Sequence, residues 1–249
     1  MSKPSGAIDM TQGKPINLML RFALPMMIGS IFQSLYSMVD SAVLGRFVGS
    51  HALAAIGATT STTGLILLLA TGVTSAISIV LSQYVGANDT DRVRKGIVAS
   101  GWITLLLGVV LGLISVFAAR PLMQLLKTPE DVIDMSVLYI QIVCGCGIAQ
   151  FAYNAAASIL RALGDSKTPL YFLILCSILN VILDLISVIG LNMGVAGVAV
   201  ATVGSQAISA AICILVMFRK YPDLMPKRHT LRPDMPVSLK IFGMGAQMA

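Results

Sequence analysis

Long apolar runs alternate with short polar segments along the whole chain, and this alternation predicts membrane-spanning helices. A helix needs about 20 residues to cross the hydrocarbon core of a bilayer. Six runs are long enough, at residues 16–44, 52–83, 96–119, 131–158, 168–190 and 194–218. Charged or turn-forming residues separate these runs, as they do where a chain leaves the bilayer. We therefore expect an all-α integral membrane protein built as a six-transmembrane-helix bundle.

The same pattern divides the chain into four parts. A polar tail at 1–15, without the features of a cleavable signal peptide, precedes the six-helix lobe at 16–218. A basic loop follows at 219–236, and the apolar stretch at 237–249 reads as the start of a seventh transmembrane helix. Because this last stretch is too short to cross a bilayer, we expect the chain to be a fragment or the N-terminal half of a larger protein.

Composition supports the membrane assignment and orients it. Only 11% of the residues are charged and 56% are hydrophobic, whereas soluble domains carry about 25% charged residues. With the tail and every second loop on one side, 14 of the 17 Lys and Arg residues fall there, leaving Arg46, Arg120 and Lys127 opposite. Cytoplasmic loops collect such residues, so we expect both termini in the cytoplasm and a multi-pass protein of the cell membrane. The scattered charges form no basic face of the kind that binds nucleic acid.

Two aspartates, Asp40 and Asp184, lie well inside apolar runs. A carboxylate there costs several kcal/mol, roughly, unless it is protonated, paired or hydrated. Each follows a proline by fifteen positions, Pro25 and Pro169, which suggests a weak internal repeat. An intramembrane carboxylate indicates a functional site for an ion or proton, although an aspartate that only holds helices together is the alternative.

Oxygen-bearing side chains accompany the two aspartates at helical spacing. Gln33 and Tyr36 precede Asp40 on the first run, Asn180 lies one turn before Asp184, and Thr202 lies at matching depth on the sixth run. Asp184, Asn180 and Thr202 would suit a hard cation such as Na⁺, whereas the carboxylates alone would suit a proton. Both coupling ions stay open at this point, and no other cofactor is expected.

A second polar stripe and one proline complete the candidate residues. Tyr139, Gln150 and Asn154 fall close to one face of the fourth run, where they could line a wet cavity or make ordinary interhelical hydrogen bonds. Together with Gln33 and Tyr36 of the first run, they are the candidates for a substrate cavity. Pro25 lies in the middle of a predicted helix and removes a backbone hydrogen bond, so we expect a kink or hinge there.

Three stretches of the sequence resemble the multidrug and toxic compound extrusion (MATE) transporters. They are FALPMMIGSIFQSLYSMVDSAVLGRFVGSHALAAIG at 22–57, SQYVGANDTDRVRKG at 82–96 and RALGDSKTPLYFLILCSILNVILDLISVIGLNMGVAGVAVAT at 161–202. The resemblance implies one lobe of a twelve-helix transporter, not an enzyme, that exports organic and often cationic compounds in exchange for Na⁺ or H⁺. It also implies a partner, namely a C-terminal six-helix lobe in the same or another chain.

The resemblance carries specific residues with it. It places the cation site of the N-terminal lobe on Asp40, Asn180, Asp184 and Thr202, and cavity positions on Tyr139 and Asn154. A flippase of lipid-linked oligosaccharides, from the same superfamily, is the nearest alternative, but no arginine lies deep in the apolar runs. An intramembrane aspartyl protease is more remote, since neither aspartate follows the Gly-x-Gly that such proteases carry.

Overall fold

The computed structural model describes residues 15–226 and 233–248, and within them every regular element is helical. Residues 1–14 of the predicted tail and 227–232 of the predicted basic loop lie outside this part. The elements are α1 Pro15–Val43, η1 Leu44–Val48, α2 Ser50–Gly86, α3 Thr90–Leu125, α4 Glu130–Gly145, α5 Ile148–Ala162, α6 Lys167–Asp184, η2 Leu185–Gly190, α7 Gly194–Lys220, η3 Pro222–Leu224 and α8 Met235–Met248. The segments η1 and η2 are π-helical, and η3 is a 3₁₀ turn.

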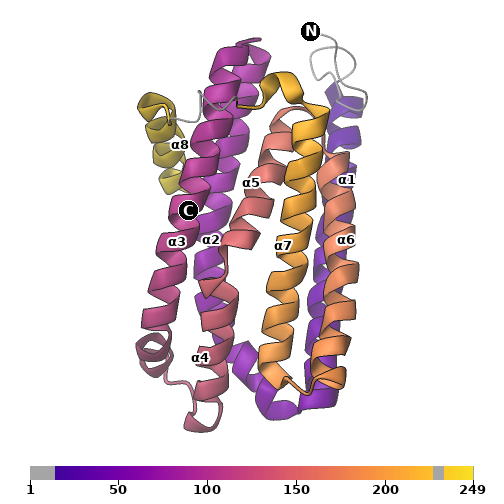
Figure 1. The fold of residues 1–249 in the computed structure, drawn as a ribbon, viewed down its shortest axis with the longest axis vertical. Helices are drawn as coiled ribbons and strands as arrows, with labels where there is room; N and C mark the ends of the chain where they lie inside the picture. The colour runs from indigo at the N-terminus through magenta and orange to yellow at the C-terminus, as the bar shows by residue number, and fades with distance from the viewer. Residues whose placement is uncertain (1–14, 227–232, 249) are drawn as a thin grey trace.

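The long helices run up and down between two ends of one bundle (Figure 1). We call the end where α1 begins and α7 finishes the upper end, and the end that holds η1 and η2 the lower end. α1 packs along α6, α6 along α7, and α8 against α2 and α3. α1 and α6 both begin at the upper end and lead into η1 and η2 at the lower end (Figure 1). They therefore run in the same direction, as expected from the predicted order of crossings.

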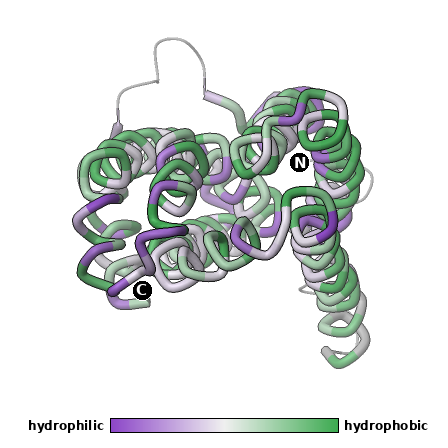
Figure 2. The backbone as a smooth tube through the Cα atoms, turned by 90° about the horizontal axis from the view of Figure 1, so that it is seen from below, coloured by the Kyte–Doolittle hydropathy of each residue, from purple (hydrophilic) through white to green (hydrophobic). Residues whose placement is uncertain are grey.

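The all-α membrane fold expected from the sequence is confirmed, although the count of spans depends on how it is made. In the described residues, four helices are long and apolar enough to cross a membrane, namely α2, α3, α6 with η2, and α7. Counting α4 and α5 together adds a fifth. α1 does not pass the same test, but with 29 residues it runs the length of the bundle beside α6 (Figure 1). Viewed end-on, hydrophobic positions predominate along the helices (Figure 2).

The span predicted at 131–158 is present but broken in the middle. α4 and α5 meet at an angle of 44° across Cys146 and Gly147. The break lies against α3, where Gly112 approaches it so closely that an added Cβ would lie 2.9 Å from the carbonyl oxygen of Gly145. Glycine permits such backbone contact, because any side chain would have to displace one of the two helices.

Clusters of buried apolar residues join the helices at different levels of the bundle. The largest cluster of buried residues joins α2, α3, α5, α7, η3 and α8. A smaller cluster at the lower end joins α1, η1, α2, η2 and α7, and we call it the lower cluster; its buried members are Val43, Leu44, Ala52, Val188, Val195 and Val198. Since the lower cluster contains both π-helical segments, it holds in place the two stretches of chain that follow the candidate aspartates.

Candidate cation site

The two candidate aspartates occupy equivalent places in the fold. Asp40 lies in the last turn of α1, shortly before η1, and Asp184 is the last residue of α6, directly before η2. A π-helical turn is rare and often accompanies a functional site. Because α1 and α6 run side by side and η1 contacts η2, the two carboxyl groups come close enough to interact. The repeat suggested by the proline–aspartate spacing therefore has a structural counterpart.

The partners predicted for Asp184 are buried on the same pair of helices, α6 and α7. Asp184 and Asn180 are fully buried and Thr202, on α7, is 5% exposed. The side-chain amide of Asn180 donates a hydrogen bond of 3.5 Å between Nδ2 and the Oγ1 atom of Thr202. This contact joins α6 to α7 and leaves the other amide atom, Oδ1, available to a different partner.

Four buried oxygens at this place have no hydrogen-bond partner among the described residues: Asp40 Oδ1, Asn180 Oδ1 and both carboxyl oxygens of Asp184. All four are acceptors when the carboxyl groups are ionised. A buried polar atom without a partner costs about 1–3 kcal/mol, and two neighbouring carboxylates also repel each other. A bound proton or a hard cation would relieve both costs, so the donor set fits either of the two ions expected from the sequence.

Two tyrosines lie next to the carboxyl groups. Tyr36 lies near Asp40 and Thr202, and Tyr139 on α4 lies near both aspartates. The sequence pattern grouped these tyrosines with a substrate cavity, whereas the structure places them at the edge of the oxygen cluster. Their hydroxyl groups can donate to a carboxylate or accept from a protonated one.

The remaining predicted residues lie elsewhere. Gln33 is exposed on α1. Gln150 and Asn154 are half-buried on α5, beyond the break from Tyr139, and no hydrogen bond joins them to the carboxyl groups in the described part of the chain. Pro25 is buried, and α1 continues through it as a helix. Their assignments to a substrate cavity and a hinge stay predictions.

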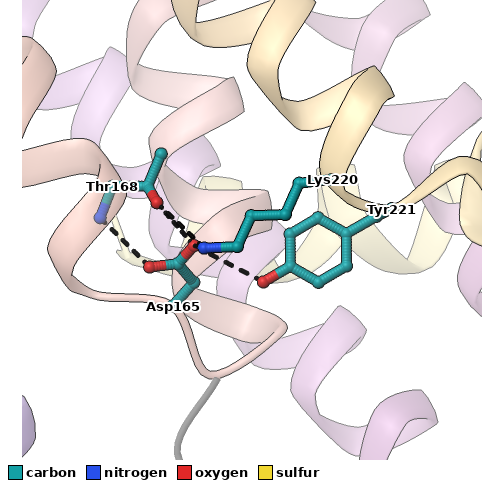
Figure 3. Close-up of polar contacts among 4 residues, drawn as sticks. All are labelled: Asp165, Thr168, Lys220 and Tyr221. Atoms are coloured by element: carbon teal, nitrogen blue, oxygen red, sulfur yellow. Dashed lines mark hydrogen bonds and ion pairs between the residues drawn. The ribbon is translucent and has the colours of Figure 1, made fainter. Parts of the chain in front are cut away.

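A second buried carboxylate, which the sequence pattern did not single out, lies at the upper end between α5 and α6. Asp165 is 1% exposed and accepts from four donors, shown in part in Figure 3. Thr168 donates its backbone amide over 3.0 Å and its hydroxyl over 2.6 Å. Lys220 Nζ lies 2.6 Å from Oδ2, and the Tyr221 hydroxyl lies 3.4 Å from it. We call this group the Asp165 clamp; it ties the start of α6 to the end of α7.

Local sequence explains how Asp165 reaches this position. Gly164, with φ of 83°, adopts the left-handed conformation that ends α5, and the amide of Asp165 then bonds back to the carbonyl of Leu160. This is a common way for a helix to terminate. Asp165 in turn caps the first turn of α6 through Thr168. The Gly-Asp followed by Thr three residues later is a recognisable stop-and-start signal, but nothing local predicts Lys220.

The electrostatics of the clamp favour an ionised aspartate. Burial alone would raise the pKa of Asp165, but the hydrogen bonds from Lys220 and Thr168 outweigh it and hold the pKa below its usual value. Asp165 is therefore a satisfied anion, in contrast to the carboxyl groups at the lower end.

Comparison with known proteins gives this geometry a family context. The MatE family model matches residues 25–186. The probable multidrug resistance protein YpnP of Bacillus subtilis is 34% identical over 205 residues, which cover 82% of this chain and 46% of that protein. The multidrug export protein MepA of Staphylococcus saprophyticus is 23% identical, covering 91% of this chain and 50% of its own length. The chain thus spans about half the length of the curated relatives it matches.

Solved structures agree with the sequence relatives. A MATE crystal structure in complex with MaD3S superposes with a TM-score of 0.89 at 25% identity, covering 99% of this chain and 55% of that one. A transporter of the MOP superfamily from Pyrococcus furiosus, described as having a binding pocket of reversed polarity, shares the fold with a TM-score of 0.89 at 24% identity. In both, the match extends over about half of the solved chain.

Proposed function

We propose that this chain, which belongs to the MatE family of transporters, forms one lobe of an antiporter that exports organic, often cationic, compounds in exchange for Na⁺ or H⁺. The observation that carries the proposal is the cluster of four buried acceptor oxygens on Asp40, Asn180 and Asp184. A purely structural polar group would be paired with donors. These oxygens have no donor among the described residues, so they can accept a proton or coordinate a cation that binds reversibly.

The mechanism follows from the difference in free energy between the oxygen cluster without a bound ion and the same cluster with one. Without a cation, two carboxylates face each other in a buried place, and the arrangement of α1, α6 and α7 that brings them together is disfavoured. When a proton or Na⁺ binds, the same arrangement becomes favourable. Binding at the cluster therefore shifts the lobe between two conformations, and the transported compound is taken up in one and released from the other.

The second lobe, the orientation and the location of the transporter belong to the same proposal. The curated relatives are about twice as long as this chain, which supports a C-terminal six-helix lobe in the same or another chain. The charge bias supports a cytoplasmic position for the upper end, which carries Arg92, Arg94, Lys95 and Lys167. The cation cluster at the lower end then lies toward the outside, where an incoming ion would enter.

The test is efflux of a fluorescent cationic dye from cells that express this lobe together with its second lobe. Asp184→Asn keeps the size of the side chain but removes the negative charge, so we expect it to abolish Na⁺- or pH-dependent efflux. Membrane insertion, followed by surface labelling, should be unchanged. Normal coupled efflux by this variant would contradict the proposal.

A second substitution separates the two coupling ions. Thr202→Val removes one oxygen without changing the shape of the side chain. A Na⁺ ion needs several oxygens around it, whereas a proton needs only a carboxylate. Loss of Na⁺-driven efflux in Thr202→Val would support Na⁺ coupling, and preserved efflux driven by a pH gradient would support proton coupling.

A further inference from the structure

The turn after Asp184 packs closely against α7 at Gly197. A Cβ added there would lie 3.1 Å from Ser187 Cβ and 3.2 Å from the backbone carbonyl carbon of Ser187. It would also lie 3.1 Å from Met193 Cβ. Because one of these atoms belongs to the backbone, a side chain at residue 197 would press on η2 or on Met193, which would have to shift by a few tenths of an ångström.

The segment that would move is attached directly to the cation cluster. Ser187 is three residues after Asp184 and is 7% exposed within η2. Its carbonyl accepts from the amide of Met193 at 3.0 Å, which closes the turn into α7. Five residues after Gly197, α7 carries Thr202, which holds Asn180. The contact at Gly197 thus joins the segment that follows Asp184 to the helix that carries Thr202.

The other half of the repeat has a larger residue at the equivalent position. Gly49 and Gly194 both have positive φ, of 112° and 56°, where the chain enters α2 and α7. Three residues further on lie Ala52 and Gly197, and Ala52 is buried in the lower cluster. A methyl group is therefore accommodated after Asp40, whereas after Asp184 it would press on η2, so the packing around Asp184 favours glycine at this position.

We infer that Gly197 is a positioning residue of the cation site: by letting η2 lie against α7, it sets the distance between the carboxyl group of Asp184 and the oxygens of Asn180 and Thr202. The inference rests on the function proposed above. The inference applies to a bound metal cation. A coordinated ion depends on fixed distances between several oxygens, whereas a proton depends on one carboxyl group.

The experiment uses this chain purified together with its second lobe in lipid nanodiscs and measures the rise of the melting temperature with Na⁺ concentration, at several pH values. We expect Gly197→Ala to raise the half-saturating Na⁺ concentration about tenfold, because sites need their groups held within about 0.5 Å of the working geometry. Gly204→Ala is the matched control on the same helix, since its added methyl would make an ordinary contact of 3.6 Å with Leu183 Cδ1. Both changes replace glycine by alanine in α7, so their effects on helix propensity cancel.

A compensating variant keeps the inference testable if Gly197→Ala also lowers stability. Ser187→Gly removes the Cβ atom that Gly197→Ala would strike, so the double variant should recover part of the lost Na⁺ affinity. A wild type that responds only to pH would show that no coordinated metal cation is held, which would overturn the role of Gly197 and leave the proposed function standing. An unchanged half-saturating Na⁺ concentration in Gly197→Ala would do the same. A wild type that responds to neither ion would overturn the proposed function, and the inference with it.

Discussion

Asp165 and Asp184 are buried carboxylates that both lie between α6 and α7, at opposite ends of the same helix pair. Asp165 receives hydrogen bonds or ion-pair contacts from Thr168, Lys220 and Tyr221 (Figure 3). Asp184 is equally buried, yet neither of its oxygens has a partner among the described residues. Burial is the same in the two cases, and only the supply of donors differs.

This difference separates a structural carboxylate from a candidate binding group. A satisfied buried ion pair holds its neighbours in one arrangement, and breaking it is costly. An unsatisfied buried carboxylate destabilises the fold around it, and the binding of an ion there increases the free energy of unfolding. The Asp165 clamp therefore joins the upper ends of α6 and α7 without any added ion. Under the proposed function, the lower end gains its additional stability only when an ion is bound, so the helix pair could change there and stay joined at the upper end.

The largest expected effect is on the response to the coupling ion. In the purified chain, Asp184→Asn should lose the rise of melting temperature with Na⁺ or protons entirely, whereas Asp165→Asn should respond at the same concentrations as the wild type. A ligand at a hundred times its dissociation constant adds about 2.7 kcal/mol to the free energy of unfolding, so the contrast is measurable. A normal response in Asp184→Asn would remove the distinction between the two carboxylates.

The next effect is on stability without added ion. Asp165→Asn leaves Lys220, whose side chain is 23% exposed, without its anion, and we expect a loss of about 2–4 kcal/mol in the free energy of unfolding. The double variant Asp165→Asn with Lys220→Met should recover much of this loss, because it removes the unpaired charge as well. Denaturation in detergent, followed by helical circular dichroism, measures both. Equal stability of Asp165→Asn and the wild type would show that the clamp contributes little.

A smaller effect concerns acid. The pKa of Asp165 is lower in the folded chain than in the unfolded one, because Lys220 and Thr168 stabilise its charged form against the cost of burial. Its contribution is therefore complete above the unfolded pKa of about 4 and is lost as the pH falls through the lower folded pKa. The difference in melting temperature between the wild type and Asp165→Asn should stay constant from about pH 7 to 5 and shrink below about pH 4. A difference that shrinks already near neutral pH would contradict this prediction, because it would mean that the pKa of Asp165 is higher in the folded chain than in the unfolded one.

The smallest effect is expected at a third carboxylate, Asp234, which precedes α8. Lys95 lies 2.9 Å from it, and this contact together with the amide of Val237 holds the pKa of Asp234 below its usual value. Exposed ion pairs contribute little and are screened by salt. Asp234→Asn should thus shift the melting temperature far less than Asp165→Asn does, and the shift should vanish in high salt. A shift as large as that of Asp165→Asn would mean that pairing, and not burial, decides the strength of these contacts.

Local patterns were sufficient for the fold class and named the central residues of the candidate site, whose role stays a prediction. The cost of a carboxylate in hydrocarbon pointed to Asp40 and Asp184, and helical spacing pointed to Asn180. The structure brings these residues together with Thr202. The break between α4 and α5 was missed because a glycine pair within an apolar run is compatible with either a straight or a bent helix. Tyr36 and Tyr139 were recognised as polar positions, but a stripe on one helix does not say which neighbour it will face.

The sequence by itself determined that the chain is helical, lies in a membrane and carries two expensive carboxylates, because these properties depend only on the order and polarity of residues along each helix. Only the tertiary structure decided which carboxylates have partners. Lys220 is 55 residues from Asp165. Gly197 on α7 lies against Ser187 of the π-helical segment η2, across the turn that joins them. Whether a buried charge is satisfied depends on side chains that arrive from other helices, and no pattern within one helix contains that information.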